Sequence, residues 1–396
     1  MKSKMENIGS KRKVIIYSTA YHPFMAGAEI AIKEITDRLG PEFDFDLITA
    51  RFDKKLPTYE KFGSIDIYRI GIGNRLFDKL WLPFGAFIKT WSLCGKKDYD
   101  AFWVMMVTFS GLGAYIYNAV GYFFKRKHIP IVISLQEGDS ENHLKYRWGG
   151  LIALSWKVAM RQSDYLTGLS NFLLDRAVKN GYKKEMTLVP NGVDLGVFSR
   201  EISPETKSDL LSKFSKKEND IFLVTWSRLT YKNAIDDVIN ALKYLPDNIS
   251  LIVMGIGEEG QKLQKLAYDI GVQERVKFLG FIQHENIPDY LSICDIFIRP
   301  SRSEGFGNSF IEAMAARLPV IATPVGGIPD FIDDNETGIF CAPNNPQSIF
   351  KSVNFILENR GIRDRIVENG WTRVNERYSW DSVALKMKTV FDRVTK

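Results

Sequence analysis

Two glutamates, Glu304 and Glu312, stand with seven residues between them around a turn that contains two glycines. The apolar run 295–298 before the turn is typical of a strand, and the segment from Ser309 onward has a helical pattern. Glycines let the backbone approach a ligand closely, and the free N–H groups at the start of a helix attract phosphate. A phosphate site beside carboxylates that can accept hydroxyl hydrogen bonds indicates a nucleotide sugar as the ligand.

A simpler interpretation of the two glutamates is structural. Ser309 and Glu312 form the Ser-x-x-Glu pattern of a capping box, in which Glu312 only closes the first helical turn. Glu304 could likewise be an exposed loop acid. Both glutamates follow a predicted strand, however, and open α/β sheets bind their ligands at the carboxyl ends of the strands. Their position therefore favours ligand binding.

Arg228 and Lys232 are candidate phosphate ligands. They follow the strand-like run 221–226 and are four residues apart, so a guanidinium fork and an ammonium group can converge on one diphosphate. The alternative is a solvated pair of loop cations. Two glycine-containing segments, 254–257 and 280–282, also follow strand-like runs, and we expect their backbone to border the nucleoside.

The segment EGFGNSFIEAMA at 304–315, followed by PVIATPVGGIP at 319–329, resembles family 4 of the retaining glycosyltransferases. The resemblance extends over roughly residues 13–392 and is specific for fold and reaction class, but not for the sugar or the acceptor. It implies the GT-B fold, an α/β architecture of two Rossmann-like, doubly wound parallel-sheet domains that face each other across a cleft.

The resemblance also assigns roles to individual residues. It implies that Arg228 and Lys232 hold the donor phosphates and that Glu304 accepts hydroxyl groups of the donor sugar. These three are the predicted catalytic residues. Glu312 would accept the ribose hydroxyl groups. The full set of predicted donor-binding residues is Gly27, Gln136, Gly255, Phe281, Ile282, Phe306, Gly307, Asn308 and Glu312.

The first half of the chain departs from the family at two places. Ala26, next to Gly27, replaces one of two glycines that the family typically has after its first strand. Gln136 stands where the family commonly has a histidine, and because an amide does not titrate, an acid–base role does not carry over. In the same loop as Gly27, Tyr21 and His22 are weak predictions for contacts with the acceptor.

No metal or other cofactor is expected. The Asp-x-Asp patterns at 44–46 and 98–100 each lead into a strand-like run, and we expect both to be surface positions at the start of a strand. Arg228, Lys232 and a helix N-terminus would neutralise the diphosphate, so a divalent cation is not needed for the leaving group.

Strand-like runs alternate with helical patterns along the chain, which predicts parallel, doubly wound sheets. Asn191 and Asp194 are expected to shape the turn between two such units. The predicted parts are a flexible basic arm at 1–12, an acceptor-side domain at 13–195, a nucleotide-sugar-binding domain at 196–379, and a helix at 380–396 that the resemblance directs back to the first domain.

The basic excess lies in the first half of the chain. Residues 1–195 have 28 Lys and Arg against 20 Asp and Glu, a net +8, and residues 196–396 have 25 against 27, a net −2. This favours an anionic membrane or a phosphate-bearing acceptor. Nucleic acid is not expected, because no binding motif with interleaved aromatic residues is present.

Two apolar segments bear on membrane contact. Glycines divide the uncharged stretch 101–124, which predicts a strand and a helix rather than a membrane span. The segment 76–97 is aromatic and edged by lysines, which suits an interfacial helix that inserts Trp81 or Trp91, although a core-facing helix with solvated lysines explains it equally well. Three scattered cysteines and a polar N-terminus predict a cytoplasmic protein, with peripheral contact to the inner membrane face left open.

The resemblance, together with the predicted anion site and carboxylates, implies a retaining, metal-independent glycosyltransferase. It would move a hexose or N-acetylhexosamine from a UDP- or GDP-sugar to an acceptor hydroxyl of a glycan or lipid-linked glycan. Two alternatives are a sugar-nucleotide epimerase and a non-catalytic nucleotide-sugar-binding subunit. Only four histidines and a glutamine at position 136 argue against the epimerase, and the complete set of cations and glutamates argues against a decayed site.

Overall fold

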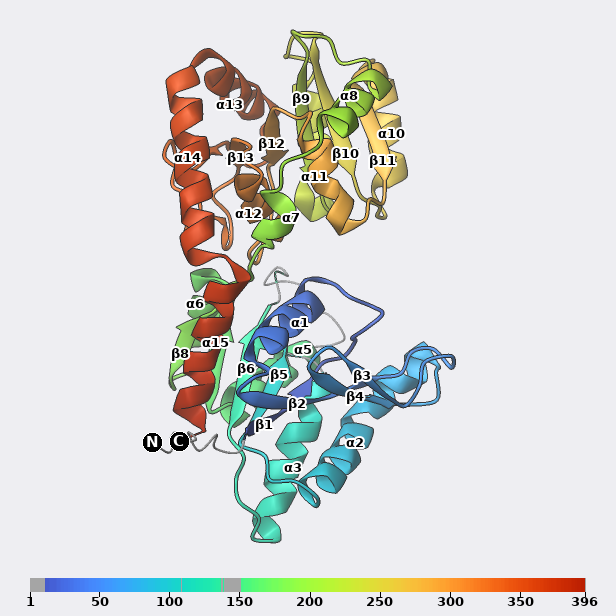
Figure 1. The fold of residues 1–396 in the computed structure, drawn as a ribbon, viewed down its shortest axis with the longest axis vertical. Coiled ribbons are helices and arrows are strands. Elements are labelled where there is room, and N and C mark those ends of the chain that lie inside the picture. The colour runs from blue at the N-terminus through green and yellow to red at the C-terminus, as the bar shows by residue number, and fades with distance from the viewer. Residues whose placement is uncertain (1–10, 108, 137, 139–150, 396) are drawn as a thin grey trace, which may run out of the picture. The chain divides into compact units, whose positions relative to one another are not determined.

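The computed structural model describes residues 11–107, 109–136, 138 and 151–395, so the predicted basic arm lies almost entirely outside the described residues. The chain forms two compact units, each built around its own sheet (Figure 1). Apart from Gly138, which belongs to the second unit, the first unit runs to Val189 and takes up the chain again at Val383, and the second spans Pro190–Ser382.

The sheet of the first unit has the strand order β3-β4-β2-β1-β5-β6-β7-β8. Neighbouring strands are parallel except β3 and β4, which form an antiparallel pair at the edge. Every residue of β5 and β6 is buried, as expected for parallel strands that helices cover on both faces. The strands are β1 (Arg12–Tyr17), β2 (Phe43–Ala50), β3 (Tyr59–Phe62), β4 (Ile65–Ile70), β5 (Ala101–Met105), β6 (Ile131–Leu135), β7 (Tyr165–Gly168) and β8 (Met186–Leu188).

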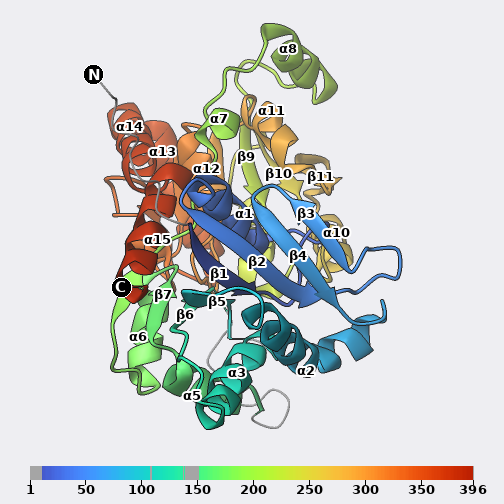
Figure 2. The same cartoon turned by 60° about the horizontal axis from the view of Figure 1, so that its bottom comes forward.

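The helices of the first unit alternate with its strands except between β2, β3 and β4, which follow one another directly. Helices α2 and α3 lie side by side (Figure 2). From Val383 onward, the last helix contributes to the core of this unit. Its Phe391 is fully buried, with its ring 5.4 Å from that of Phe43 and 5.6 Å from that of Trp103. The helices are α1 (Gly27–Leu39), α2 (Arg75–Cys94), α3 (Leu112–Phe123), α5 (Leu151–Gln162), α6 (Asn171–Lys179) and α15 (Trp380–Val394).

The sheet of the second unit is parallel throughout, with the order β11-β10-β9-β12-β13-β14. The chain first adds strands on one side of β9 and then returns to add β12 on the other side, which is the strand order of a dinucleotide-binding domain. Its strands are β9 (Ile221–Trp226), β10 (Ile249–Met254), β11 (Val276–Gly280), β12 (Ile296–Arg299), β13 (Val320–Ala322) and β14 (Ile339–Phe340).

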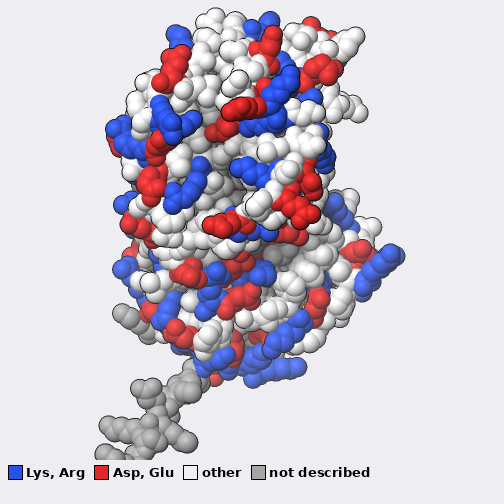
Figure 3. All heavy atoms as spheres, turned by 45° about the horizontal axis from the view of Figure 1, so that its top comes forward, with Lys and Arg blue, Asp and Glu red and all other residues white. Residues whose placement is uncertain are grey.

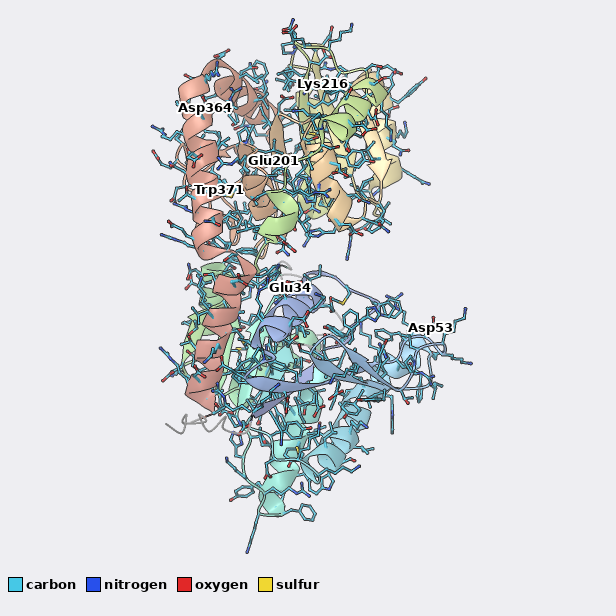
Figure 4. The ribbon with its side chains drawn as sticks, in the orientation of Figure 1. Glu34, Asp53, Glu201, Lys216, Asp364 and Trp371 are labelled. Atoms are coloured by element: carbon cyan, nitrogen blue, oxygen red, sulfur yellow. The ribbon has the colours of Figure 1, made fainter. Side chains whose placement is uncertain are left out.

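Side chains at the ends of elements fix the helices of the second unit. The Asp194 carboxylate caps α7 by accepting a hydrogen bond from the Val197 amide at 3.1 Å, which confirms its predicted structural role. Lys216, labelled in Figure 4, binds the Asp295 carboxylate at 2.6 Å just before β12. The helices are α7 (Leu195–Phe198), α8 (Pro204–Lys213), α9 (Ile235–Ala241), α10 (Gly260–Asp269), α11 (Ile287–Leu291), α12 (Asn308–Ala315), α13 (Pro346–Glu358) and α14 (Arg360–Arg377).

The two predicted doubly wound sheets are confirmed, but the prediction that Asp46 lies at the surface is wrong. Asp46 is only 4% exposed, because β2 begins at Phe43 and places Asp46 inside the strand. Its carboxylate accepts hydrogen bonds from the Lys97 ammonium at 3.0 Å and from the Tyr99 hydroxyl. The second Asp-x-Asp segment is likewise used internally, since Asp100 accepts a hydrogen bond from the Lys13 amide. Both patterns therefore serve the fold of the first unit.

Candidate functional site

The strand order of the second unit creates a switch point between β9 and β12. Ligands bind open α/β sheets in the crevice outside the carboxyl ends of such strands. The loop after β9 carries Arg228 and Lys232, and the loop after β12 carries Glu304. The two loops are joined directly, because the Arg302 amide donates to the Lys232 carbonyl at 2.7 Å.

Arg228 and Lys232 leave their charges available to a ligand. Arg228 is exposed, and Lys232 lies half-buried in the short 3-10 helix Tyr231–Asn233. The Asn233 side chain donates to the Arg228 carbonyl at 2.6 Å and so holds this turn. Within the part of the chain that the structure describes, no carboxylate lies at ion-pairing distance from either cation.

The loops after β9, β10 and β11 form one connected edge. Gly255 has a φ of +132°, and a Cβ there would lie 1.9 Å from the Ser227 carbonyl oxygen, so only glycine fits. Its amide donates to the Gly280 carbonyl at 2.7 Å, and the Leu229 amide donates to the Ile256 carbonyl at 3.0 Å. This bonding joins segments 254–257 and 280–282, and their contact with the nucleoside stays a prediction.

The same edge exposes apolar side chains. Phe281 is 70% exposed and Ile256 is 62% exposed, while Ile282 is half-buried. Aromatic and aliphatic groups of this kind suit the flat face of a nucleobase. The assignment of Phe281 and Ile282 to the donor nucleoside remains a prediction.

Glu304 is fixed from several sides. One carboxylate oxygen accepts a hydrogen bond from Arg299 Nη2 at 2.6 Å, and the other accepts one from the Gly305 amide at 3.0 Å. Gly326 has a φ of +58°, and a Cβ on it would lie 1.8 Å from the Glu304 carbonyl oxygen. The Gly327 amide donates to that carbonyl at 3.2 Å. The glycine pair after β13 therefore supports the predicted sugar-binding residue.

Arg299, the last residue of β12, was not predicted from the sequence. Burial lowers the pKa of its guanidinium, against the opposing effect of Glu304 and Glu312. Its Nη1 donates to the Ser309 hydroxyl at 2.7 Å, and its guanidinium lies 4.3 Å from the centre of the Phe310 ring. The available signal was an arginine directly after the apolar run 295–298.

Glu312 is buried and held by two side chains from distant parts of the unit. Trp226 Nε1 donates to one carboxylate oxygen at 2.8 Å, and His284 Nε2 lies 2.9 Å from the other. The capping-box interpretation is wrong, because Gly307 is the N-cap residue of α12 and the Ser309 hydroxyl binds Arg299 instead. The helix also begins at Asn308, one residue earlier than expected.

The turn between the glutamates uses its side chains internally. The Phe306 ring is 2% exposed and packs 5.2 Å from the Phe331 ring and 5.7 Å from the Tyr378 ring, so only its backbone can meet a ligand. Gly307 is half-buried at the start of α12. The Asn308 side chain accepts a hydrogen bond from Asn191 at 3.1 Å.

The remaining predicted residues belong to the first unit. Gly27 begins α1, and Gln136 follows β6 in a half-buried position. Tyr21 is 2% exposed, and burial raises the pKa of its hydroxyl far above the usual value. The His22 ring stacks on that of Phe62 at 4.1 Å. The Tyr21 hydroxyl is therefore buried, and the acceptor contacts of Tyr21 and His22 stay predictions.

Relatives of known class match the whole chain. Residues 25–197 match the family model described as Glycosyltransferase Family 4, and residues 207–373 match that described as Glycosyl transferases group 1. An uncharacterised glycosyltransferase of Methanocaldococcus jannaschii is 27% identical, covering 96% of this chain and 97% of its own. A GDP-mannose-dependent alpha-(1-6)-phosphatidylinositol monomannoside mannosyltransferase of Mycobacterium tuberculosis is 30% identical over 57% of this chain and 60% of its own.

Solved structures share the fold. A sucrose-phosphate synthase from Thermosynechococcus elongatus superposes with a TM-score of 0.80 at 18% identity, covering 97% of this chain and 99% of its own. Anabaena HepE, in complex with UDP and glucose, gives a TM-score of 0.75 at 18% identity, covering 96% of this chain and all of its own (100%). Both structural matches concern the fold, whereas the family models and the sequence relatives concern the enzyme class. The chain is a glycosyltransferase of family 4 with the GT-B fold.

Proposed function

We propose that the protein is a retaining glycosyltransferase that moves a hexose or N-acetylhexosamine from a UDP- or GDP-sugar to an acceptor hydroxyl of a glycan or lipid-linked glycan. The observation that carries the proposal is the arrangement at the switch point of the second sheet. Arg228 and Lys232 have no acidic partner among the described residues, and the loop bonded to theirs presents Glu304. Two cations beside a fixed carboxylate fit a sugar diphosphate.

The names of similar proteins support the class of donor. The solved Anabaena protein was crystallised with UDP and glucose, and the mycobacterial relative is named for its use of GDP-mannose. Both donors are nucleoside diphosphate sugars, which differ in base and sugar but share the diphosphate. Arg228 and Lys232 would bind that shared part.

The proposed chemistry relies on the leaving group. As the bond from the sugar to the diphosphate breaks, negative charge develops on the departing oxygen, and Arg228 and Lys232 would stabilise it. Removing one such preorganised donor typically lowers the rate by about 100- to 1000-fold. Both oxygens of Glu304 already accept protein hydrogen bonds, so in this conformation Glu304 is placed to bind hydroxyl groups rather than to attack carbon.

Retention of configuration without a protein nucleophile implies departure and attack on the same face of the sugar. The acceptor hydroxyl would then give its proton to an oxygen of the leaving diphosphate. No divalent cation is required in this scheme, since protein cations supply the positive charge.

A panel of donors tests the proposal and separates it from its two alternatives. UDP-glucose, UDP-N-acetylglucosamine and GDP-mannose, each incubated with a mixture of simple glycosides, should show release of UDP or GDP with one of them. NMR of the product should show the anomeric configuration of the donor. An epimerase would convert the donor without releasing nucleoside diphosphate, and a binding subunit would bind it without turnover.

We also propose that α2 brings the first unit to an anionic membrane surface. One face of this helix is buried through Leu82, Ala86 and Leu93, so α2 does pack on the core. The opposite face is also apolar, which a purely core-facing helix would not show. Its exposed members are Leu76, Phe77, Leu80, Trp81, Phe84 and Ile88, each between 41% and 68% exposed.

Cations accompany this apolar face. Arg75 and Lys79 are exposed near the start of α2, and Lys125 and Lys127 are exposed just after α3. On the face that Figure 3 shows, Lys and Arg are interspersed with Asp and Glu. Among the described helices, none is both long and apolar enough to cross a bilayer. The proposed contact is therefore one of a helix that lies on the membrane surface.

A further inference from the structure

The side chain of Arg302, two residues before Glu304, uses every hydrogen-bond donor that it has. A guanidinium offers five N–H groups. Nε donates to the Asn344 side chain at 2.6 Å, and Nη1 donates to the Tyr231 carbonyl at 2.8 Å. The other three donors bind Asp236 at 2.9 and 2.8 Å and Asp237 at 2.9 Å. Arg302 therefore has no donor left for a ligand.

These contacts surround the turn that carries Lys232. The Arg302 amide binds the Lys232 carbonyl at 2.7 Å, and the guanidinium lies 4.3 Å from the centre of the Tyr231 ring. Both contacts are made to the 3-10 helix Tyr231–Asn233, which contains Lys232. The backbone at Lys232 is thus fastened to the loop that leads into Glu304.

The ion pairs of Arg302 with Asp236 and Asp237 also affect the charge around Lys232. Asp236 and Asp237 follow Lys232 by four and five residues, in the first turn of α9. They are the nearest acids to Lys232 in the sequence, and a lysine is a flexible point charge that pairs readily with such a neighbour. In the structure Arg302 takes both carboxylates, with three hydrogen bonds, and Lys232 has no acidic partner among the described residues.

We propose that Arg302 is a positioning residue that keeps Lys232 free for the donor diphosphate. It does so by binding Asp236 and Asp237 and by fixing the turn Tyr231–Asn233. This inference rests on the proposed function, because it takes Lys232 as a diphosphate ligand. It predicts that Arg302 acts on donor affinity through charge as well as through geometry. Removal of the aspartate charges should therefore compensate for the loss of Arg302.

Arg275 provides a matched control in the same unit. Its guanidinium also serves five acceptors, namely the carbonyl groups of Leu242, Leu245, Pro246 and Ile249 and the carboxylate of Asp247. These acceptors lie before and at the amino end of β10, and Arg275 itself directly precedes β11, away from the carboxyl ends that carry Lys232 and Glu304. Arg275→Gln should thus destabilise the fold without changing the binding of a nucleoside diphosphate.

The test measures UDP and GDP binding by calorimetry for the full-length wild type and for Arg302→Gln, Arg302→Lys, Arg275→Gln and Lys232→Ala, together with their melting temperatures. We expect Arg302→Gln to weaken binding about tenfold, Arg302→Lys to weaken it less, and Arg275→Gln to leave it unchanged. Adding Asp236→Asn and Asp237→Asn to Arg302→Gln should return the affinity to within about threefold of the wild type.

Each outcome decides a separate point. If Arg302→Gln binds as tightly as the wild type, or if the triple variant binds as weakly as Arg302→Gln alone, the positioning role is wrong. Arg302→Lys retains a cation and answers the same question if Arg302→Gln does not fold. If the wild type binds neither nucleotide, or if Lys232→Ala binds normally, the proposed function itself fails. Arg302→Gln should cause no further loss in the Lys232→Ala background, since Arg302 acts on binding only through Lys232.

Discussion

His284 and Glu312 form a hydrogen-bonded pair, in which His284 Nε2 lies 2.9 Å from a carboxylate oxygen of Glu312. The other oxygen accepts a hydrogen bond from the Trp226 indole at 2.8 Å. Glu312, the predicted partner of the ribose, is therefore held between the end of β9 and the segment after β11. One of its two partners is a histidine, the side chain whose charge changes closest to neutral pH.

The first prediction concerns the pH dependence of this pair. Burial by itself lowers the pKa of His284, but the hydrogen bond and charge of Glu312, with Glu285 and Asp194 nearby, raise that pKa above its usual value. A histidine of this kind stabilises the fold fully below its unfolded pKa of about 6.5, and the contribution is lost as pH rises through the folded pKa. His284→Gln should therefore lower the melting temperature most at about pH 5.5–6, with a difference that shrinks toward about pH 8.

Thermal unfolding of both proteins across this pH range checks the prediction. In a Glu312→Gln background the same substitution should have little pH-dependent effect, because the carboxylate that raises the pKa of His284 is gone. A difference in melting temperature that stays constant from acid to alkaline pH would show that the pair does not titrate as described.

The second prediction concerns the cations of the β9 loop. Lys232→Ala and Arg228→Ala should each weaken nucleoside diphosphate binding, and the loss of a charge-assisted hydrogen bond to phosphate should cost about 1.5–3 kcal/mol. Isothermal calorimetry with UDP and GDP measures this loss. Lys265→Ala is the control, because Lys265 is an exposed lysine of α10 that pairs with Asp269 at 2.7 Å. Equal affinity in all three variants would show that neither Arg228 nor Lys232 binds the donor diphosphate.

Much of this site could be predicted because its signals are local. Apolar runs located the strands, with β9 predicted at residues 221–226 as observed and β12 predicted at 295–298 but observed at Ile296–Arg299. Glycines and charged residues directly after those runs located the loops of the switch point. What the sequence could not reveal is which side chains hold the glutamates. Trp226 and Glu312 are separated by 86 positions, and only the order of strands in the folded sheet brings them together.

Arg299 and His284 are two site residues that the sequence analysis does not predict, and they differ in the strength of their local sequence signals. Arg299 closes an apolar run, and a cation at the buried end of a strand demands a partner. His284 follows the predicted base-binding segment 280–282, but its partner Glu312 stands on another element, and no local pattern joins the two. The predicted surface position of Asp46 is wrong because β2 begins three residues before it and places it inside the strand.

The third prediction separates the two glutamates. Glu312→Gln should mainly weaken nucleotide binding, since the predicted partner of Glu312 is the ribose. Glu304→Gln should spare the affinity for free UDP or GDP and lower turnover of the sugar donor, since its predicted partner is the sugar. Calorimetry and donor turnover together check the contrast, with melting temperatures recorded because both side chains bind internal donors. Equal loss of nucleotide affinity in both variants would contradict the assignment.

The fourth prediction is that transfer proceeds without a divalent metal. Activity in excess EDTA should remain close to that with added magnesium or manganese, because Arg228, Lys232 and the N-terminus of α12 would carry the positive charge at the diphosphate. The measurement is the initial rate of donor turnover under each condition. Complete loss in EDTA that added metal restores would show that the protein cations are insufficient.

The last prediction concerns α2 and the membrane. A cation near an anionic lipid surface contributes roughly 1 kcal/mol, and salt screens this attraction. Exposed apolar side chains that enter the interface add to it. Co-sedimentation with vesicles of phosphatidylglycerol should thus be measurable at low salt, reduced at high salt and weak with phosphatidylcholine.

Substitutions in α2 identify the inserting residues. Trp81 is 41% exposed, whereas Trp91 packs under the Arg126 guanidinium at 4.1 Å and against Phe87, so of the two tryptophans only Trp81 is placed to insert. The double variant Trp81→Gln, Phe84→Gln should lose most vesicle binding, with only a small drop in melting temperature, because Phe84 is 58% exposed and Trp81 is partly buried against Phe77 and Phe84. Tyr268→Gln, which removes an exposed aromatic of α10 in the second unit, should bind as the wild type does. Equal binding of all three proteins, or none to anionic vesicles at low salt, would mean that α2 is not a membrane contact.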